Sequence, residues 1–156
     1  MRLSVADKWV EPPLKRFVDE ARAHLAVLLH PSGQVLGQFG FARSVDVMTA
    51  CALSAAIHAS SVELGRMVDG TPFTGLHYAG ERWQLFLGPV PISGGSLLLL
   101  TVFDEESSLG LVRLYFKEFC ADVLQVAPPP NAAAPTLADD FEGELNRNLA
   151  VMFGRV

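Results

Sequence analysis

The stretch Ser-Leu-Leu-Leu-Leu-Thr-Val-Phe at 96–103 decides the fold, together with Asp-Glu-Glu-Ser-Ser at 104–108 and the apolar-rich residues after it. The continuous apolar run predicts a strand that is buried on both of its faces. Beyond the polar loop, apolar residues recur at intervals of three and four, which predicts a helix packed on this strand through Val112, Phe116, Phe119, Cys120 and Val123. Carboxylates and hydroxyls in the loop can accept hydrogen bonds from the first N–H groups of that helix, so capping alone explains its polarity.

The composition favours one soluble domain with a tail. Half of the 156 residues are apolar, which is enough for a layered core without metal or disulfides. The net charge of -5 argues against a nucleic-acid partner, since binding to phosphates needs a basic face. The apolar stretch 97–103 is too short to cross a membrane, and residues 1–8 lack a signal-peptide core. Cys51 and Cys120 fall in expected helices as buried thiols, so we expect a cytoplasmic protein without membrane insertion.

Proline, glycine and changes of hydrophobic spacing divide the chain into its expected elements. Pro12 and Pro13 fit the first turn of a short helix whose apolar positions recur to Leu25. Turn residues then separate two strands of a hairpin, and a long central helix starts at Ser44 and ends before Gly70. The expected strands are 25–29, 35–39, 73–78, 82–87 and 96–103, with a loose connection over 88–95, and the last long helix covers 108–126. The final three strands should form an antiparallel meander.

The C-terminal residues divide into a linker and a further helix. Residues 127–135 are rich in proline and alanine, which predicts a semi-rigid linker after a domain at 9–126. Within 136–156, Phe141, Leu145 and Leu149 form the apolar stripe of an acidic amphipathic helix. Two interpretations stay open: this helix packs back on its own domain, or it docks in a groove of a partner.

The central helix has two different faces on a helical projection. Its large apolar residues, Leu53, Ile57, Leu64 and Val68, share one face that we expect to bury against the sheet. The other face is small and nearly uncharged, with Ala52, Ala55, Ala56, Ala59 and Glu63. Small residues allow close approach of another helix, so this face favours association. The alternative is that alanine serves only helix propensity.

The sequence contains no recognisable catalytic or cofactor motif. The four histidines are scattered and the two cysteines lie far apart, so the spacing of a local zinc site is missing. No glycine-rich phosphate loop and no Gly-x-Ser-x-Gly nucleophile elbow occur. We therefore expect no metal site, no cofactor and no enzymatic activity of the chain itself.

The order of elements over 25–124 resembles the Roadblock/dynein light chain family, most closely its bacterial GTPase regulators. The specific part is Val-Phe-Asp-Glu-Glu-Ser-Ser-Leu-Gly-Leu-Val-Arg-Leu at 102–114, which is similar to the strand, loop and helix of those regulators. Val45-Asp46 and the hairpin turn at 30–34 add weaker support. The resemblance implies a five-stranded antiparallel sheet between helices in the order α-β-β-α-β-β-β-α, an α/β fold of the α+β type.

The same resemblance implies partners. It suggests a homodimer in which central helices pair and strands join into one sheet, and a two-fold surface that holds a small Ras-like GTPase of the MglA type. In that family the regulator repositions the GTPase's own switch residues, and a C-terminal helix can touch the GTPase. The residues expected to bind partners are Ala52, Ala55, Ala56, Ala59, Glu63 and Arg66 on the central helix and Phe141, Leu145 and Leu149 in the tail. The alternative is a Roadblock scaffold that dimerises and docks other proteins.

Overall fold

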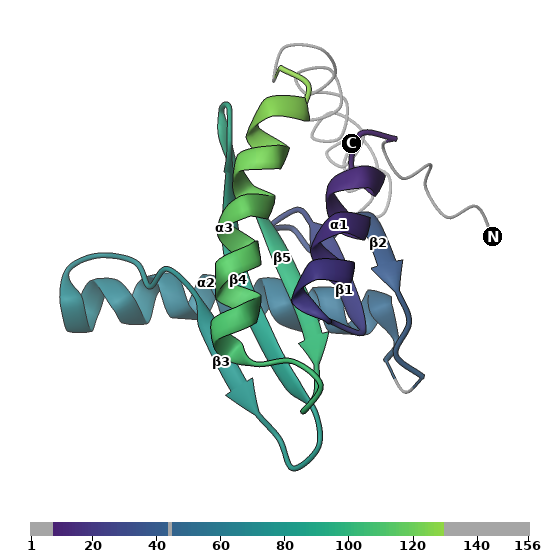
Figure 1. Cartoon of the computed structure of the whole chain (residues 1–156). Coiled ribbons are helices and arrows are strands. Elements are labelled where there is room, and N and C mark those ends of the chain that lie inside the picture. Colours follow the sequence, from purple (N-terminus) through teal and green to yellow (C-terminus); the bar gives the residue numbers. More distant parts are fainter. Residues whose placement is uncertain (1–7, 44, 130–156) are drawn as a thin grey trace, which may run out of the picture.

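Strand β5 (Gly95–Phe103) lies in the middle of a five-stranded antiparallel sheet, and residues 97–103 are buried as the apolar run predicts. The computed structural model describes residues 8–43 and 45–129 (Figure 1). The strand order is β2-β1-β5-β4-β3. The other elements are α1 (Glu11–Ala21), β1 (Leu25–Leu29), β2 (Val35–Gly40), α2 (Val47–Asp69), β3 (Leu76–Ala79), β4 (Gln84–Ile92) and α3 (Leu109–Val126). The expected order of elements and the antiparallel meander are confirmed.

The sheet separates two hydrophobic clusters because side chains alternate between its faces. Helices α1 and α3 cover one face, and α2 crosses the other face (Figure 1). In the cluster between these two helices and the sheet, Phe17 of α1 and Phe119 of α3 are in contact, with ring centroids 5.6 Å apart. Under α2, the cluster includes Leu25, Val27, Leu29, Cys51, Leu87, Leu98, Leu100 and Val102. The domain therefore has three layers, with the sheet in the middle.

Strand β4 is longer than the sequence predicts. It continues through Pro89 and Pro91 to Ile92, where we had expected a loose connection. That expectation was wrong because β3 pairs only with Gln84–Leu87, so the far part of β4 is an edge. The two prolines are two residues apart, and their nitrogens therefore share the side that faces away from β5. A proline there removes no hydrogen bond of the ladder.

Strand β3 starts at Leu76, three residues later than expected. Residues 71–73 instead pass the end of α2, where a Cβ added to Gly65 would lie only 2.7 Å from the Phe73 nitrogen. Glycine at position 65 permits this close passage of the backbone. Phe73, the first residue of the expected strand, thus passes close to α2 and is not part of the sheet.

Side-chain caps define the starts of both long helices. The Asp46 carboxylate accepts hydrogen bonds from the Thr49 hydroxyl at 2.7 Å and the Thr49 N–H at 3.5 Å, so α2 begins at Val47. Ser44, the expected cap, lies outside the described residues. At α3, the Ser108 hydroxyl accepts from the Leu111 N–H at 3.1 Å, which confirms that the polar loop caps this helix.

Candidate functional site

Helix α2 contacts the sheet through small side chains. Its buried residues are Cys51, Ser54 and Gly65, which share one stripe along the helix. Val47, Ala50 and Ile57 pack beside this stripe on the second hydrophobic cluster. Small residues at these positions let the helix axis approach the sheet closely, as small residues do between helices.

The large apolar residues of α2 face solvent, which corrects the expectation that they bury against the sheet. Leu53, Leu64 and Val68 are 59%, 53% and 72% exposed, and only Ile57 of the expected set is half-buried in the cluster. Helical periodicity identifies an apolar stripe but does not say which side the sheet occupies. With the small stripe turned inward, the bulky stripe is left outside.

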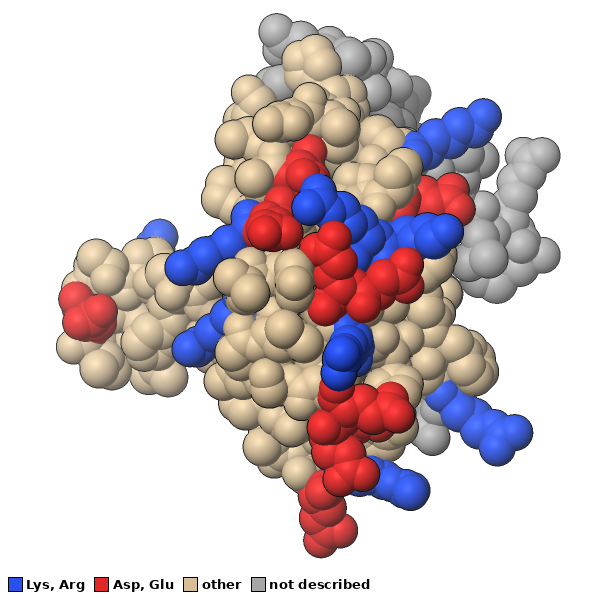
Figure 2. All heavy atoms as spheres, viewed as in Figure 1, with Lys and Arg blue, Asp and Glu red and all other residues tan. Residues whose placement is uncertain are grey.

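The exposed apolar residues of α2 form one candidate interaction surface. We call it the apolar face of α2, and its members are Leu53, Leu64, Met67 and Val68. The C-terminal half of α2 projects beyond the sheet (Figure 1), and its surface is mostly uncharged (Figure 2). Exposed patches of large apolar side chains are typical of interaction sites, and Leu64, Met67 and Val68 lie within five consecutive positions of α2. Two features of the sequence could have indicated this exposed face. The helix has a high mean hydropathy, and Cys51, Ser54 and Gly65 form a stripe of small residues that can pack closely on a sheet.

Most of the predicted site residues on α2 are solvent-exposed. Ala52, Ala56, Ala59, Glu63 and Arg66 are exposed, whereas Ala55 is half-buried. The hairpin turn between β1 and β2 accounts for the difference, because a Cβ at Gly33 would lie 3.9 Å from the Ala55 Cβ. These exposed alanines lie on the flank of the helix next to the apolar face. The predicted tail residues Phe141, Leu145 and Leu149 lie outside the described residues.

The charged pair at the predicted site is internal to α2. The Arg66 Nη1 atom lies 3.0 Å from Glu63 Oε1, one turn earlier on the same helix. Both side chains are exposed, so the pair contributes little to stability. It holds the guanidinium along the helix surface rather than extended from it.

By length and hydropathy alone, α2 could cross a membrane. An 18-residue window has a mean hydropathy of 1.3, and 17% of this window is buried. The first half of α2 nevertheless belongs to the hydrophobic cluster that it forms with β1 and β5. The helix is therefore an element of the folded domain.

Strand β3 forms one edge of the described sheet, near the apolar face of α2. It pairs with β4 from Leu76↔Leu87 to Ala79↔Gln84, and its other side has no strand among the described residues. Tyr78 on this strand and Leu85 on β4 are partly exposed large side chains. An unpaired edge beside an apolar helix is suited to sheet extension by another chain.

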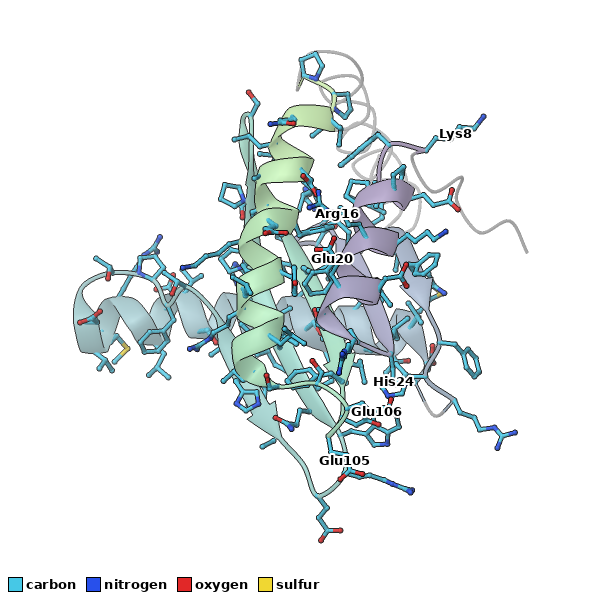
Figure 3. All side chains as sticks on the ribbon, in the orientation of Figure 1. Lys8, Arg16, Glu20, His24, Glu105 and Glu106 are labelled. Carbon is cyan, nitrogen blue, oxygen red and sulfur yellow. The ribbon has the colours of Figure 1, made fainter. Side chains whose placement is uncertain are left out.

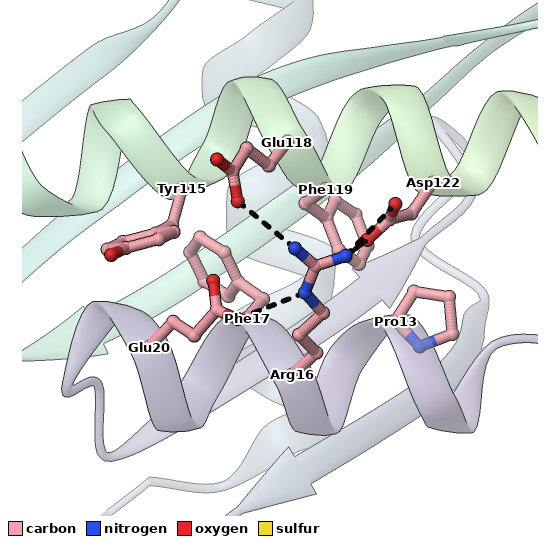
Figure 4. Close-up of a pocket in the computed structure, with 8 residues that line it drawn as sticks. All are labelled: Pro13, Arg16, Phe17, Glu20, Tyr115, Glu118, Phe119 and Asp122. Atoms are coloured by element: carbon pink, nitrogen blue, oxygen red, sulfur yellow. Dashed lines mark hydrogen bonds and ion pairs between the residues drawn. The ribbon is translucent and has the colours of Figure 1, made fainter.

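The face formed by α1 and α3 is charged and serves packing (Figure 2). Arg16 on α1 lies 3.0 Å from Glu20, 3.4 Å from Glu118 and 3.2 Å from Asp122, and so links the two helices (Figure 4). These carboxylates, the side-chain hydrogen bond of Glu20 first, raise the pKa of Arg16. The shallow groove beside this cluster is lined by Trp9, Pro12, Pro13, Arg16, Asp122, Gln125 and Val126.

The described residues offer no activated nucleophile on α2 or α3. Burial raises the pKa of both the Cys51 and the Cys120 thiol to about 11, which keeps them protonated at neutral pH. Burial also lowers the pKa of His58 on α2, so this imidazole stays neutral.

Several solved structures share this architecture. MglB of Myxococcus xanthus matches 81% of this chain and 92% of its own at 22% identity, with a TM-score of 0.69. A structure described as MglB with tetrameric arrangement matches 81% and 93% at 24% identity and a TM-score of 0.70. The Roadblock/LC7 domain from Streptomyces avermitilis matches 72% and 92% at 16% identity and a TM-score of 0.63. No protein-family model matches the chain, and no curated protein sequence is significantly similar to it. The chain therefore has the Roadblock/LC7 fold, which it shares with MglB.

Proposed function

We propose that this Roadblock/LC7-fold chain acts as a homodimer that binds a small Ras-like GTPase of the MglA type and stimulates its GTP hydrolysis in the cytoplasm. The observation that carries the proposal is the exposed apolar face of α2, on a fold shared with MglB. An exposed apolar face promotes aggregation when it is left in solvent, and it stabilises an assembly when a partner buries it.

The homodimer is supported by two neighbouring features. The apolar face of α2 can be covered by the same face of a second copy, since a two-fold interface is self-complementary. The edge of β3 can then pair with a second β3, which would join the two sheets. Assembly is a property of at least one protein with this fold, because an MglB structure has a tetrameric arrangement.

The proposed GTPase-binding surface, which we call the GTPase seat, consists of the small residues that flank the apolar face. Ala52, Ala56 and Ala59 are exposed and carry no side chain beyond Cβ, so a partner backbone can approach α2 closely. Ala55 contributes less because the hairpin turn already covers part of it. In the dimer, two such alanine rows would flank the two-fold axis.

The proposed mechanism repositions residues of the GTPase. Arg66 is the charged donor of the seat, and its guanidinium is paired with Glu63 on the same helix. An inserted catalytic arginine would have to leave that pair, so Arg66 acts as a contact residue. Ordering a switch glutamine and arginine of the GTPase acts on the same transition-state charge for which arginine fingers supply roughly 10³–10⁵-fold.

The tail has a separate proposed role. The stripe Phe141, Leu145 and Leu149 docks on the bound GTPase and changes its affinity or nucleotide exchange. Deletion of residues 136–156 should spare the dimer and alter GTPase affinity or exchange. If the affinity for the GTPase and the rate of nucleotide exchange both stay as in the full chain, the tail packs on its own domain instead.

The alanine seat is tested by Ala59→Arg, measured as phosphate release from a purified GTPase of the MglA type. The long charged side chain blocks close packing, so we expect stimulation to fall at least about tenfold, the equivalent of roughly 1.4 kcal/mol. Ala121→Arg on α3 is the matched control, since this alanine is also exposed and lies on the other face of the sheet.

Three outcomes separate the candidate functions. Stimulation by the unaltered chain and by Ala121→Arg, but not by Ala59→Arg, supports the proposal. Stimulation that survives Ala59→Arg places the GTPase elsewhere. No stimulation and no co-elution with the GTP-bound form favours a Roadblock scaffold that docks other partners.

A further inference from the structure

A histidine and two carboxylates meet at one end of the sheet, where β1 begins and β5 ends. The His24 Nε2 atom lies 2.9 Å from Asp104 Oδ2 and 3.6 Å from Glu106 Oε2. The three side chains place one ligand atom each within 4.8 Å of one another. Figure 3 shows His24 and Glu106 at this end of the molecule, away from the projecting half of α2. We expected no metal site because the histidines are scattered along the sequence, but β1–β5 pairing brings His24 to carboxylates that lie about eighty residues away.

The imidazole nitrogen in this cluster lacks an aligned hydrogen bond. Nε2 of His24 is covered from solvent and has no hydrogen-bond partner among the described residues. The contact with Asp104 meets the distance of a hydrogen bond but not its direction. An unpaired buried polar atom is costly. A cation held by all three side chains would lie off the line that joins nitrogen and oxygen, and such a position is compatible with the misaligned contact.

The backbone fixes His24 in this position. Its N–H donates to the Val102 carbonyl at 2.9 Å, and its carbonyl accepts from the Phe41 N–H at 2.7 Å. The Trp83 ring packs edge-on against the imidazole with centroids 4.9 Å apart. The histidine is therefore held by Phe41 just after β2, by Val102 on β5 and by Trp83 just before β4, as a preorganised ligand requires.

The loop after β5 is also fixed by hydrogen bonds. Asp104 Oδ1 accepts from the Glu106 N–H at 3.0 Å, which leaves Oδ2 turned toward His24. The Ser107 hydroxyl donates to the Ala21 carbonyl at the end of α1. The two oxygens of Asp104 thus have separate partners, one for the turn and one for the cluster.

We propose that His24, Asp104 and Glu106 bind a divalent transition-metal ion, with Zn²⁺ as the best match. Zn–N and Zn–O bonds of about 2.0–2.2 Å in a tetrahedron place ligand atoms roughly 3.3–3.6 Å apart, close to the separations of 2.9 and 3.6 Å found here. An imidazole with two carboxylates suits Zn²⁺, whereas Mg²⁺ and Ca²⁺ prefer oxygen alone. Glu106 is 72% exposed, so the ion has a path of entry and a fourth position for water.

The bound ion would clamp the first residue before β1 to the loop that starts α3. Binding to the folded chain alone raises its thermal stability. The site lies apart from the apolar face of α2, so this proposal does not depend on the GTPase partner.

The test is titration of the full chain with Zn²⁺ alone, followed by calorimetry and thermal unfolding. We expect one ion per chain and a higher Tm, with much weaker effects of Mg²⁺ and Ca²⁺. Co²⁺, which takes similar ligands, should quench the emission of the tryptophan next to the site, and Trp83→Phe should remove that quenching because Trp9 lies elsewhere.

Two neighbouring glutamates supply the matched variants. Glu106→Ala should weaken Zn²⁺ binding by more than the roughly 10- to 100-fold that loss of an outer-shell group costs. Glu105→Ala removes the adjacent exposed carboxylate and should bind like the unaltered chain. His24→Gln should abolish binding while His30→Gln leaves it unchanged. Equal affinities of Glu106→Ala and Glu105→Ala would overturn the proposal, as would the absence of any Zn²⁺-dependent change in Tm. Because Glu106 is exposed, its variant decides the question even if His24→Gln fails to fold.

Discussion

Cys51 and Cys120 illustrate how single side chains are controlled by their surroundings. Cys51 is fully buried between α2 and the sheet, and Cys120 is half-buried under α3. Burial disfavours the thiolate and raises the pKa of each to about 11, above the ordinary value of 9.0. The folding free energy therefore carries no penalty from them below pH 9, and stability is lost as pH rises from 9 toward 11.

We predict that both thiols react slowly with a disulfide reagent at pH 8. A pKa higher by about two units lowers the thiolate fraction roughly a hundredfold relative to an unfolded chain, and Cys51 is also shielded from the reagent. The measurement compares the release of reporter thiolate from native and denatured protein. Rapid labelling of two thiols in the native protein would contradict this prediction.

At the scale of elements, the end of β2 shows how one glycine fixes a strand against its neighbour. Gly40 has a φ of 91°, and a Cβ there would lie within 3.0 Å of the carbonyl carbon of His24. The same backbone group accepts the hydrogen bond of Phe41. A side chain at position 40 therefore meets both a strained φ and a backbone atom that cannot move alone.

Gly40→Ala should lower the free energy of unfolding by about 2–5 kcal/mol, the sum of a left-handed φ and of overpacking. Gly70→Ala is the matched control, since Gly70 has a φ of 75° but nothing within 4 Å of an added Cβ. It should cost only about 1–2 kcal/mol. Urea unfolding of both variants separates the two causes, and equal losses would mean that the contact with His24 is relieved by local movement.

At the scale of the whole molecule, the apolar face of α2 leaves large apolar side chains in solvent. The projecting half of α2 presents Leu64, Met67 and Val68, and Met67 is 82% exposed. The charged face over α1 and α3 lies on the opposite side of the sheet (Figure 2). A second copy that covers the apolar face would leave a polar exterior.

We predict that Leu64→Glu shifts the chain toward monomer, because burying an unpaired carboxylate in an apolar interface is unfavourable. The dimer dissociation constant should rise at least about tenfold. Leu114→Glu on α3 is the matched control, since both leucines are 53% exposed and lie on opposite sides of the sheet. Sedimentation across a range of protein concentrations measures the effect. If both variants dissociate alike, or if the unaltered chain is monomeric, α2 is not the interface.

The most predictable part of the fold was the stretch from β5 to α3. Its apolar run, capping serine and helical spacing are local signals that agree with one another, and the structure confirms them. The end of β4 was less predictable, since proline usually terminates a strand. Whether its missing N–H matters depends on the presence of a neighbouring strand, which is a property of the sheet.

The candidate site likewise has features that the sequence predicts and features that only the packing of the elements decides. The sequence by itself determined that α2 is long, apolar on one side and small on another, and that Ala52, Ala56 and Ala59 share a flank. Only the tertiary structure decided that the small stripe of Cys51, Ser54 and Gly65 meets the sheet and leaves the leucines outside. It also brought His24 to Asp104 and Glu106. Periodicity records which residues share a face of one element, whereas contacts between faces and across strands arise only when distant elements pack together.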